Sequence, residues 1–330
     1  MNEALQLDSV DGIAGTVLAI DIGGTKTGWG LIRVTPGVRP EVTESGSIPT
    51  NAGAGGAAVA QRVVDLIRGI AAGTPLLLGI GIASAGVVNP ETGDIVSATN
   101  IMPGWGGTPL GTIVAEETGL PTYVLNDVHA HGLGEAIHGA GRGARNVLVA
   151  AVGTGLGGAF VSDGRVALGE HNIAGHFGHV HHHFANGQPC SCGRTGHIEA
   201  ICSGSGITSW FNSLRDPQTP EVSGGRELQE LAESGDELAL RVFAESATAL
   251  GVTLGSLANC VDPGVVVLSG SMTKSGQAWW DAVRAGYRDS AMNPVRDVEI
   301  LDGELGSAAP LIGAAQHFLA EHARRQTTSS

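Results

Sequence analysis

The chain has little positive charge. It carries 18 lysine and arginine residues against 32 aspartate and glutamate residues, for a formal net charge of −14. Nucleic acids and anionic membranes both require a basic surface, so neither is expected as the main partner. Long apolar runs are missing too. No stretch of about 18 uninterrupted apolar residues occurs, so we expect no transmembrane helix.

A signal peptide and a disulfide framework are also missing. The first eight residues are acidic and lack a basic region followed by an apolar one, which predicts a cytoplasmic protein. Residues 1–15 are expected to form a short frayed lead. Cysteines number only four, and disulfides are rare in the cytoplasm, so we expect free thiols at Cys190, Cys192, Cys202 and Cys260.

Glycine is abundant instead. The chain of 330 residues holds 52 glycines, dispersed along its length, which indicates many tight turns and sites lined by backbone. Apolar residues make up 42% and charged residues 15%, a composition typical of a well-buried globular protein. The length allows two domains of ordinary size.

One glycine turn lies close to the N-terminus. An apolar run ends in Asp21 and is followed by Gly23, Gly24, Thr25 and Lys26 before a second apolar run begins. This pattern predicts a strand, a tight turn and a second strand. Glycines let backbone N–H groups approach an anion, Thr25 and Lys26 add a hydroxyl and a cation for phosphate oxygens, and Asp21 is placed to hold a hydrated Mg²⁺. An ordinary glycine-rich hairpin is the alternative.

A second strand, glycine turn and strand occur about 130 residues later, at Gly153, Thr154 and Gly155. A third small-residue turn, containing Gly270, follows a strand expected at 265–268. The repetition suggests two similar domains that face each other across a cleft. The remaining apolar patterns predict strands at 16–22, 28–34, 76–83, 122–125, 147–152 and 159–162, helices at 57–72, 108–118, 128–138 and 307–325, and a mainly helical region at 203–259.

Asn126 and Asp127 stand at a strand end, next to a helix start. Both residue types cap helices well, so a structural cap is one interpretation. The other is a general base at Asp127 that takes a proton from a substrate hydroxyl as the hydroxyl attacks a phosphate. Phosphoryl transfer needs little beyond such a base, in-line positioning and charge neutralisation.

A histidine-rich block contains two of the cysteines. Seven of the twelve histidines lie between residues 171 and 197. Cys190 and Cys192 are one residue apart and His197 follows five residues later, a spacing that suits a compact tetrahedral zinc knuckle. A loop without metal is the alternative. A fourth ligand must come from upstream.

The order of these motifs, from about residue 16 to 320, resembles the ROK family of bacterial repressors and sugar kinases, within the actin-like ATPase superfold. The resemblance implies an α/β fold of two domains, the actin-like (ribonuclease H-like) ATPase fold, with ATP and a sugar in the interdomain cleft. It also implies that the C-terminal helix packs on the first domain. We place the smaller domain at residues 1–125 plus 308–330, and the larger, with the base, the knuckle and the adenosine side, at 126–307.

The resemblance also implies roles for single residues. Asp127 would be the base and Asn126 would hold a sugar hydroxyl. His179 would be the fourth zinc ligand, with His181 and His183 as competitors, and the metal would be structural. We expect metal removal to lower activity without affecting the ATP site. The remaining sugar contacts would be Ser84, Gly86, Asn100, His176, His179 and Glu199, and the nucleotide contacts Asp21, Gly23, Gly24, Thr25, Lys26, Gly153, Thr154, Gly155 and Gly270.

His176 bears on which sugar binds. The family usually has a glutamate at this place, which only accepts hydrogen bonds when ionised, whereas a neutral imidazole donates one and accepts one. That suits an acetamido group. Residues 81–86 and the segment from Cys192 to Ile201 are also similar to those of bacterial N-acetylmannosamine kinases. We therefore expect phosphorylation of N-acetylmannosamine at the 6-hydroxyl.

Other functions are weighed against this one. A glucokinase or an N-acetylglucosamine kinase would use the same site, and polyphosphate could replace ATP as donor. A sugar-responsive ROK repressor needs a winged-helix module before the core, for which we find too few residues. A catalytically silent sugar-binding subunit would not need both Asp21 and Asp127. We expect a homodimer.

Overall fold

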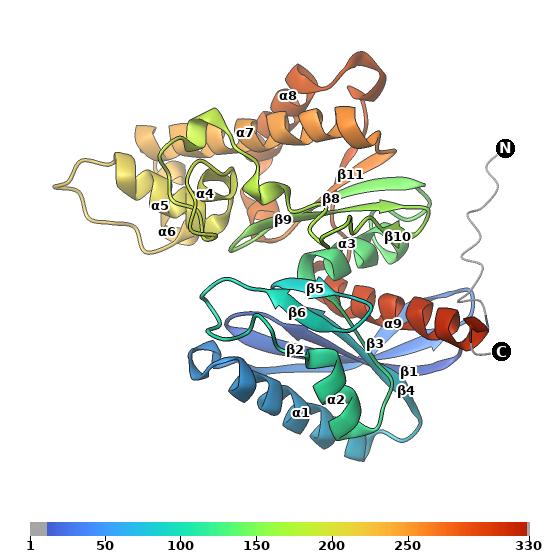
Figure 1. The fold of residues 1–330 in the computed structure, drawn as a ribbon. Helices are drawn as coiled ribbons and strands as arrows, with labels where there is room; N and C mark the ends of the chain where they lie inside the picture. The colour runs from blue at the N-terminus through green and yellow to red at the C-terminus, as the bar shows by residue number, and fades with distance from the viewer. Residues whose placement is uncertain (1–11, 329–330) are drawn as a thin grey trace. The chain divides into compact units, whose positions relative to one another are not determined.

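The computed structural model describes residues 12–328 (Figure 1). Most of the lead predicted at 1–15 lies outside the described residues. The chain divides into two compact units. The first holds the chain up to Gly143, Asp163–Ala174 and the chain from Glu304 onward, and the second holds Ala144–Ser162 and Gly175–Gly303. These boundaries differ from the domains we predicted, because the helix that starts at Asp127 and the segment Asp163–Ala174 group with the first unit.

The first unit is built on a five-stranded sheet. β1 pairs antiparallel with β2 and parallel with β4, which pairs parallel with β7. All four residues from Val17 to Ile20 are fully buried, so β1 is a central strand. In sheet order the strands are β3 (Val38–Pro49), β2 (Lys26–Thr35), β1 (Gly15–Ile22), β4 (Leu77–Ser84) and β7 (Thr122–Asn126), and a separate ribbon pairs β5 (Val87–Asn89) with β6 (Asp94–Ser97).

Different helices cover the two faces of this sheet. Ile80 and Ile82 of β4 pack in one apolar core with α1 (Gly56–Gly73) and α2 (Leu110–Thr118). On the other face α9 (Ala309–Thr328) packs on β4, β1 and β7. A Cβ at Gly79 would lie 2.4 Å from the Phe318 ring, and one at Gly81 would lie 2.3 Å from the Ala314 carbonyl. Glycine in β4 thus lets α9 lie directly on the sheet, which confirms that the C-terminal helix packs on the first unit.

The second sheet repeats the strand order of the first. β8 pairs antiparallel with β9 and parallel with β11, which pairs parallel with β12. The two hairpins that carry the glycine turns therefore occupy the same place in each sheet, as the repetition in the sequence predicted. In sheet order the strands are β10 (Arg165–Val166), β9 (Leu156–Ser162), β8 (Asn146–Val152), β11 (Val265–Ser269) and β12 (Ile300–Asp302).

Helices of the second unit surround α7 (Glu237–Val261), which packs closely on α8 (Gln277–Ser290) because a Cβ at Gly251 would lie 2.0 Å from the Val283 carbonyl. By length and composition α7 could cross a membrane, but more than half of its apolar window is buried in the protein, as in a core helix. The other helices are α3 (Asp127–His138) of the first unit and α4 (Glu199–Cys202), α5 (Gly204–Leu214) and α6 (Gly225–Glu233) of the second, and the 3₁₀ turns include η2 (Phe177–His179) and η3 (His183–Ala185).

The strands and helices predicted above are all present, with ends shifted by a few residues. The prediction omitted β3 and α8, and also the short elements β5, β6, β10, β12 and α4. β3 is an edge strand whose residues are mostly exposed, so no alternation of apolar side chains marks it. α8 does carry a signal, since Trp279, Val283 and Tyr287 recur every four residues and are buried.

Candidate active site

The first glycine turn connects β1 to β2 and is held from behind by Thr50. The Gly23 N–H donates to the Lys26 carbonyl at 3.1 Å, and the Thr50 N–H donates to the Thr25 carbonyl at 3.0 Å. The Thr50 hydroxyl also donates to the Gly23 carbonyl at 2.7 Å. No acceptor among residues 12–328 takes the N–H of Gly24 or Thr25. Two backbone donors of the turn therefore stay available to an anion.

Two carboxyl groups stand at one edge of the first sheet. Asp21 is the next-to-last residue of β1 and Asp127 follows β7. Both strands run parallel to β4, so their carboxyl ends meet at the same edge. Burial, and then the nearby Asp127, raises the pKa of Asp21 to about 7, although Lys26 opposes the rise. No donor in the described chain bonds to the Asp21 carboxylate, which leaves both its oxygens for a cation.

Asn126 is the residue that caps α3. Its side-chain oxygen accepts hydrogen bonds from the N–H groups of Val128 and His129, both at 3.1 Å. Its amide nitrogen donates to the Gly86 carbonyl and to Asp127 Oδ1, both at 2.8 Å. The capping interpretation therefore holds for Asn126. These bonds use both N–H groups and both lone pairs of the amide, so the sugar contact predicted for Asn126 would replace or share one of them.

Asp127 is oriented by its neighbours. Its Oδ1 accepts from the Val128 N–H at 2.9 Å as well as from Asn126. Oδ2 accepts no hydrogen bond from any other described residue. Burial raises the pKa of Asp127, while these two hydrogen bonds lower it. The geometry leaves one carboxylate oxygen fixed and the other open, as a general base requires.

Three further sugar contacts were predicted in the first unit. Ser84 is fully buried at the end of β4, where the Trp105 indole N–H donates to its hydroxyl at 3.3 Å. Gly86 has φ of +99° and holds Asn126 through its carbonyl. Asn100 is exposed, with its side chain outside these contacts. Ser84 and Gly86 thus support the edge at Asn126, and their contact with a sugar stays a prediction.

The second glycine turn, between β8 and β9, is held by the segment from Glu199 to Ser205. The Gly204 N–H donates to the Gly153 carbonyl at 2.7 Å, and the Ser205 hydroxyl donates to the Thr154 carbonyl at 2.6 Å. The Leu156 N–H donates to Glu199 Oε2 at 3.1 Å. Thr154 and Gly155 are exposed, and their N–H groups have no acceptor among residues 12–328. This turn also presents two backbone donors.

Gly270 supports the same turn from β11. Its φ is +103°, and a Cβ there would lie 2.4 Å from the Val152 carbonyl. Glycine is therefore required where the chain leaves β11 beside the end of β8. Its predicted contact with the adenosine side remains untested.

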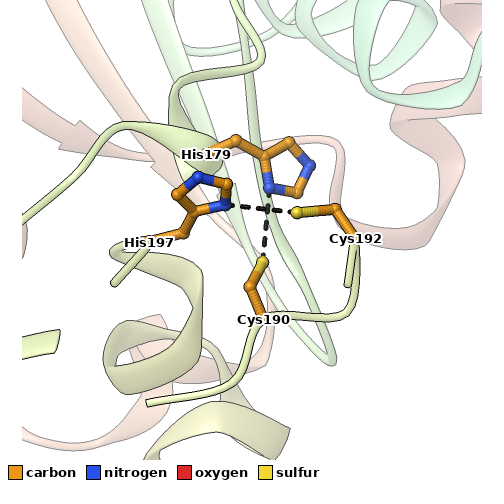
Figure 2. A group of neighbouring side chains, drawn as sticks. All are labelled: His179, Cys190, Cys192 and His197. Carbon is orange, nitrogen blue, oxygen red and sulfur yellow. Dashed lines mark hydrogen bonds between the residues drawn. The ribbon is translucent and has the colours of Figure 1, made fainter. Parts of the chain in front are cut away.

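The histidine and cysteine block gathers four ligand atoms (Figure 2). The ligand atoms of His179, Cys190, Cys192 and His197 all lie within 4.8 Å of one another. Cys190 Sγ lies 3.5 Å from His179 Nδ1, and Cys192 Sγ lies 3.2 Å from His197 Nδ1. Zinc bonds of about 2.0–2.3 Å in a tetrahedron separate neighbouring ligands by roughly 3.3–3.8 Å.

The four residues therefore fit Zn²⁺ in number, type and spacing. His181 and His183, the predicted competitors, are exposed and are not members of the group. Burial raises the pKa of the Cys190 thiol to about 11, and a bound metal would hold it as the thiolate.

Glu199 connects the knuckle to the second turn. Its Oε1 accepts a hydrogen bond from the Ser191 hydroxyl at 2.5 Å, and its Oε2 accepts from Leu156. The sugar contact that the family resemblance implies for Glu199 stays a prediction. The sequence analysis did not predict its hydrogen bond with Ser191, which stands between the two cysteines. His176 lies before η2, three residues from His179, and the role of its imidazole toward a sugar stays a prediction. Thr50 was not predicted either, because it follows β3, a strand that the sequence patterns did not indicate.

Comparisons with known proteins find relatives along nearly the whole chain. The family model described as "ROK family" matches residues 17–321. A glucokinase from Halalkalibacterium halodurans is 32% identical over 90% of this chain and 92% of its own. An N-acetylmannosamine kinase from Citrobacter koseri is 31% identical over 78% of this chain and 83% of its own.

Among solved structures, a ROK family glucokinase from Streptomyces griseus in complex with glucose and AMPPNP is 27% identical, with a TM-score of 0.75 over 94% of this chain and 100% of its own. The two sheets share one strand order, as the actin-like ATPase fold requires. On the match across nearly its whole length, the chain belongs to the ROK family.

Proposed function

We propose that this protein is an ATP-dependent sugar kinase that phosphorylates a hexose at its 6-hydroxyl. The observation that carries the proposal is the pairing of Asp127, with one oxygen fixed and one open, with Asp21 at the same sheet edge. Two glycine turns with available N–H donors supply the phosphate contacts. The similar glucokinases and the N-acetylmannosamine kinase support the reaction class.

Asp127 acts as the general base. The 6-hydroxyl oxygen forms a bond to the γ-phosphorus while its proton passes to Asp127 Oδ2, and the bond from phosphorus to the bridging oxygen breaks to release ADP. Val128 and Asn126 hold Oδ1, so the carboxylate cannot rotate away from the acceptor. The raised pKa makes the carboxylate a stronger base than an exposed aspartate.

Asp21 would hold Mg²⁺, whose oxygen-ligand preference matches the open carboxylate. The metal, when bound, neutralises charge on the phosphates. Its cationic field would lower the pKa of Asp21 from about 7 and keep the group ionised at neutral pH. The N–H groups of Gly24 and Thr25 would donate to phosphate oxygens, and those of Thr154 and Gly155 offer the same kind of contact within the second unit.

The knuckle would hold Zn²⁺ through His179, Cys190, Cys192 and His197. All four tetrahedral positions are filled by side chains, so the site has no open position for a substrate and is structural. Metal content measured on the purified protein tests this, with one zinc per chain expected.

N-acetylmannosamine is the proposed sugar, because His176 can both donate to and accept from an acetamido group. Glucose is the second candidate, because a glucokinase is 32% identical over 90% of this chain, against 31% over 78% for the N-acetylmannosamine kinase. An ADP-release assay with ATP, Mg²⁺ and each of N-acetylmannosamine, N-acetylglucosamine, glucose and mannose decides between them. We expect the highest kcat/KM for N-acetylmannosamine. Faster turnover of glucose would overturn the sugar assignment and leave the kinase assignment intact.

Polyphosphate is tested as donor in the same assay. We propose ATP, and turnover with polyphosphate alone would contradict that choice. The homodimer remains a prediction, and light scattering at several concentrations measures it directly.

A further inference from the structure

We propose that Ser191 is a positioning residue for the nucleotide, acting through Glu199 on the second glycine turn. This inference rests on the proposed kinase function. It differs from our expectation that removal of the metal would leave the ATP site unaffected. One unbroken series of hydrogen bonds joins them within the second unit, from the Ser191 hydroxyl to the Glu199 carboxylate to the Leu156 N–H.

The Leu156 end of this series fixes the turn. Leu156 is the first residue of β9 and follows Gly155 directly. A Cβ at Gly155 would lie only 3.2 Å from Glu199 Oε2, so the carboxylate sits against the backbone of the turn. Gly155 is exposed and has no side chain to hold it. The bond from the N–H of the next residue, Leu156, to Glu199 therefore limits how far the Gly155 N–H can move. A shift of this N–H would misalign a phosphate contact.

The Ser191 end fixes the carboxylate. Glu199 is half-buried, and a glutamate side chain has three rotatable torsions that must be held to keep Oε2 on Leu156. The Ser191 hydroxyl bonds to the other oxygen, so both ends of the carboxylate are held. A hydrogen bond to a charged acceptor favours the rotamer that makes it.

The knuckle fixes Ser191 in turn. The residue stands between Cys190 and Cys192, two of the four proposed zinc ligands, in a tight loop where the Cys190 N–H donates to the Arg194 carbonyl at 2.8 Å. A metal that binds both cysteines would lock the backbone on either side of Ser191. Metal occupancy would therefore reach the nucleotide site through the Ser191 hydroxyl, next to Cys190 Sγ, which lies 3.5 Å from the same Glu199 oxygen.

The test compares Ser191→Ala, Ser191→Thr and Thr195→Ala with the wild type. Thr195 lies in the same loop, is exposed, and makes no side-chain hydrogen bond to a described residue, so its variant is the matched control. Titration calorimetry with a non-hydrolysable ATP analogue, Mg²⁺ and no sugar measures nucleotide affinity apart from any contact of Glu199 with sugar. All samples are brought to equal zinc content.

We expect Ser191→Ala to bind the analogue roughly three- to tenfold more weakly. Thr195→Ala should equal the wild type, and Ser191→Thr, which keeps the hydroxyl, should recover most of the affinity. Removal of the metal with a chelator should weaken binding in the wild type and change it less in Ser191→Ala, because one link is already broken. Hydrogen exchange of the peptide that covers residues 153–156 should quicken in Ser191→Ala.

Equal affinities of Ser191→Ala and Thr195→Ala in a protein that binds the analogue and phosphorylates hexoses would overturn this inference alone. A wild type that neither binds the analogue nor phosphorylates any hexose would overturn the proposed function with it. If Ser191→Ala loses zinc or unfolds, Ser191→Thr and the chelated wild type decide. Unchanged nucleotide binding after chelation then contradicts the inference.

Discussion

The two glycine turns have the same place in two sheets of the same order, yet different residues hold them. Behind the first turn, Thr50 bonds through its hydroxyl and its N–H to the carbonyls of Gly23 and Thr25. Behind the second, Glu199 holds the Leu156 N–H and is itself held by Ser191. The repeated fold thus gives the two turns the same place in their sheets, while different residues hold each turn.

The two turns also differ in charge. The first contains Lys26 and lies beside Asp21 and Asp127, whose pKa values are both raised. The second has Thr154 between its glycines and no charged residue of its own. We infer that proton transfer and the magnesium ion belong to the first turn, and that the second contributes backbone contacts steadied by the knuckle.

The sharpest way to break this comparison is Asp127→Asn. The amide keeps the shape of the side chain but cannot take a proton, so kcat should fall roughly 10²- to 10⁴-fold. Binding of a non-hydrolysable ATP analogue should stay near the wild-type value. Asp65→Asn removes an exposed carboxylate from α1 and is the control, with activity unchanged. Near-normal turnover by Asp127→Asn would remove Asp127 from the mechanism.

Asp21→Asn should separate stability from function at the first turn. The folded pKa of about 7 exceeds the ordinary aspartate pKa of 3.8, so the folded state binds more protons and the wild type loses stability as pH rises between these values. Without nucleotide or Mg²⁺, the variant should gain on the order of 2–4 kcal/mol in free energy of unfolding at pH 8. Urea unfolding at pH 4 to 8 measures this. Catalysis should fall in the same variant.

The pH dependence of the gain is what identifies its cause. If Asp21→Asn is stabilised equally at pH 4 and pH 8, ionisation of the buried carboxyl group is not the source of the difference.

Cys192→Ser tests the second turn. Loss of one ligand should release zinc and lower kcat/KM about 10- to 100-fold, since the loop that orders Glu199 would loosen. Metal content and steady-state rates are measured together. Cys260→Ser is the matched control, because Cys260 is exposed on α7 and outside the group. Full activity in a zinc-free Cys192→Ser protein would show that the metal has no role at this turn.

Thr50→Val gives the smallest expected effect. The valine removes the hydroxyl bond to Gly23 and leaves the buried Thr27 hydroxyl without its partner at 2.9 Å. We expect a loss of about 1–2 kcal/mol in free energy of unfolding and roughly three- to tenfold weaker nucleotide binding. Chemical denaturation and calorimetry measure the two effects. Nucleotide binding as tight as in the wild type would mean that the first turn does not need its tether.

Sequence patterns predicted the parts of this molecule that depend on local spacing. Both glycine turns, the helix after Asn126 and the cysteine pair were readable because the chemistry lies within a few residues. The boundary of the first unit was not, because α3 groups with it through packing against α9, far along the chain. Thr50 and Ser191 were not predicted, for a related reason. Each acts on a residue brought close only by folding.

Asn126 and Asp127 show what local sequence leaves open about a site. The sequence offered a cap or a functional pair at Asn126 and Asp127, and the structure gives the cap to Asn126 and leaves Asp127 with an open oxygen. Local residue types predicted the pair. Which of the two residues caps the helix and which keeps an open oxygen depended on the fold, where the Asn126 amide donates to the Gly86 carbonyl.

Amide hydrogen exchange of the wild type, with and without a saturating non-hydrolysable ATP analogue and Mg²⁺, tests most directly whether both turns bind phosphate. We predict slower exchange on nucleotide binding in the peptides that cover residues 23–26 and 153–156. Protection of neither peptide, with the nucleotide shown to be bound, would contradict the assignment of both turns to phosphate binding.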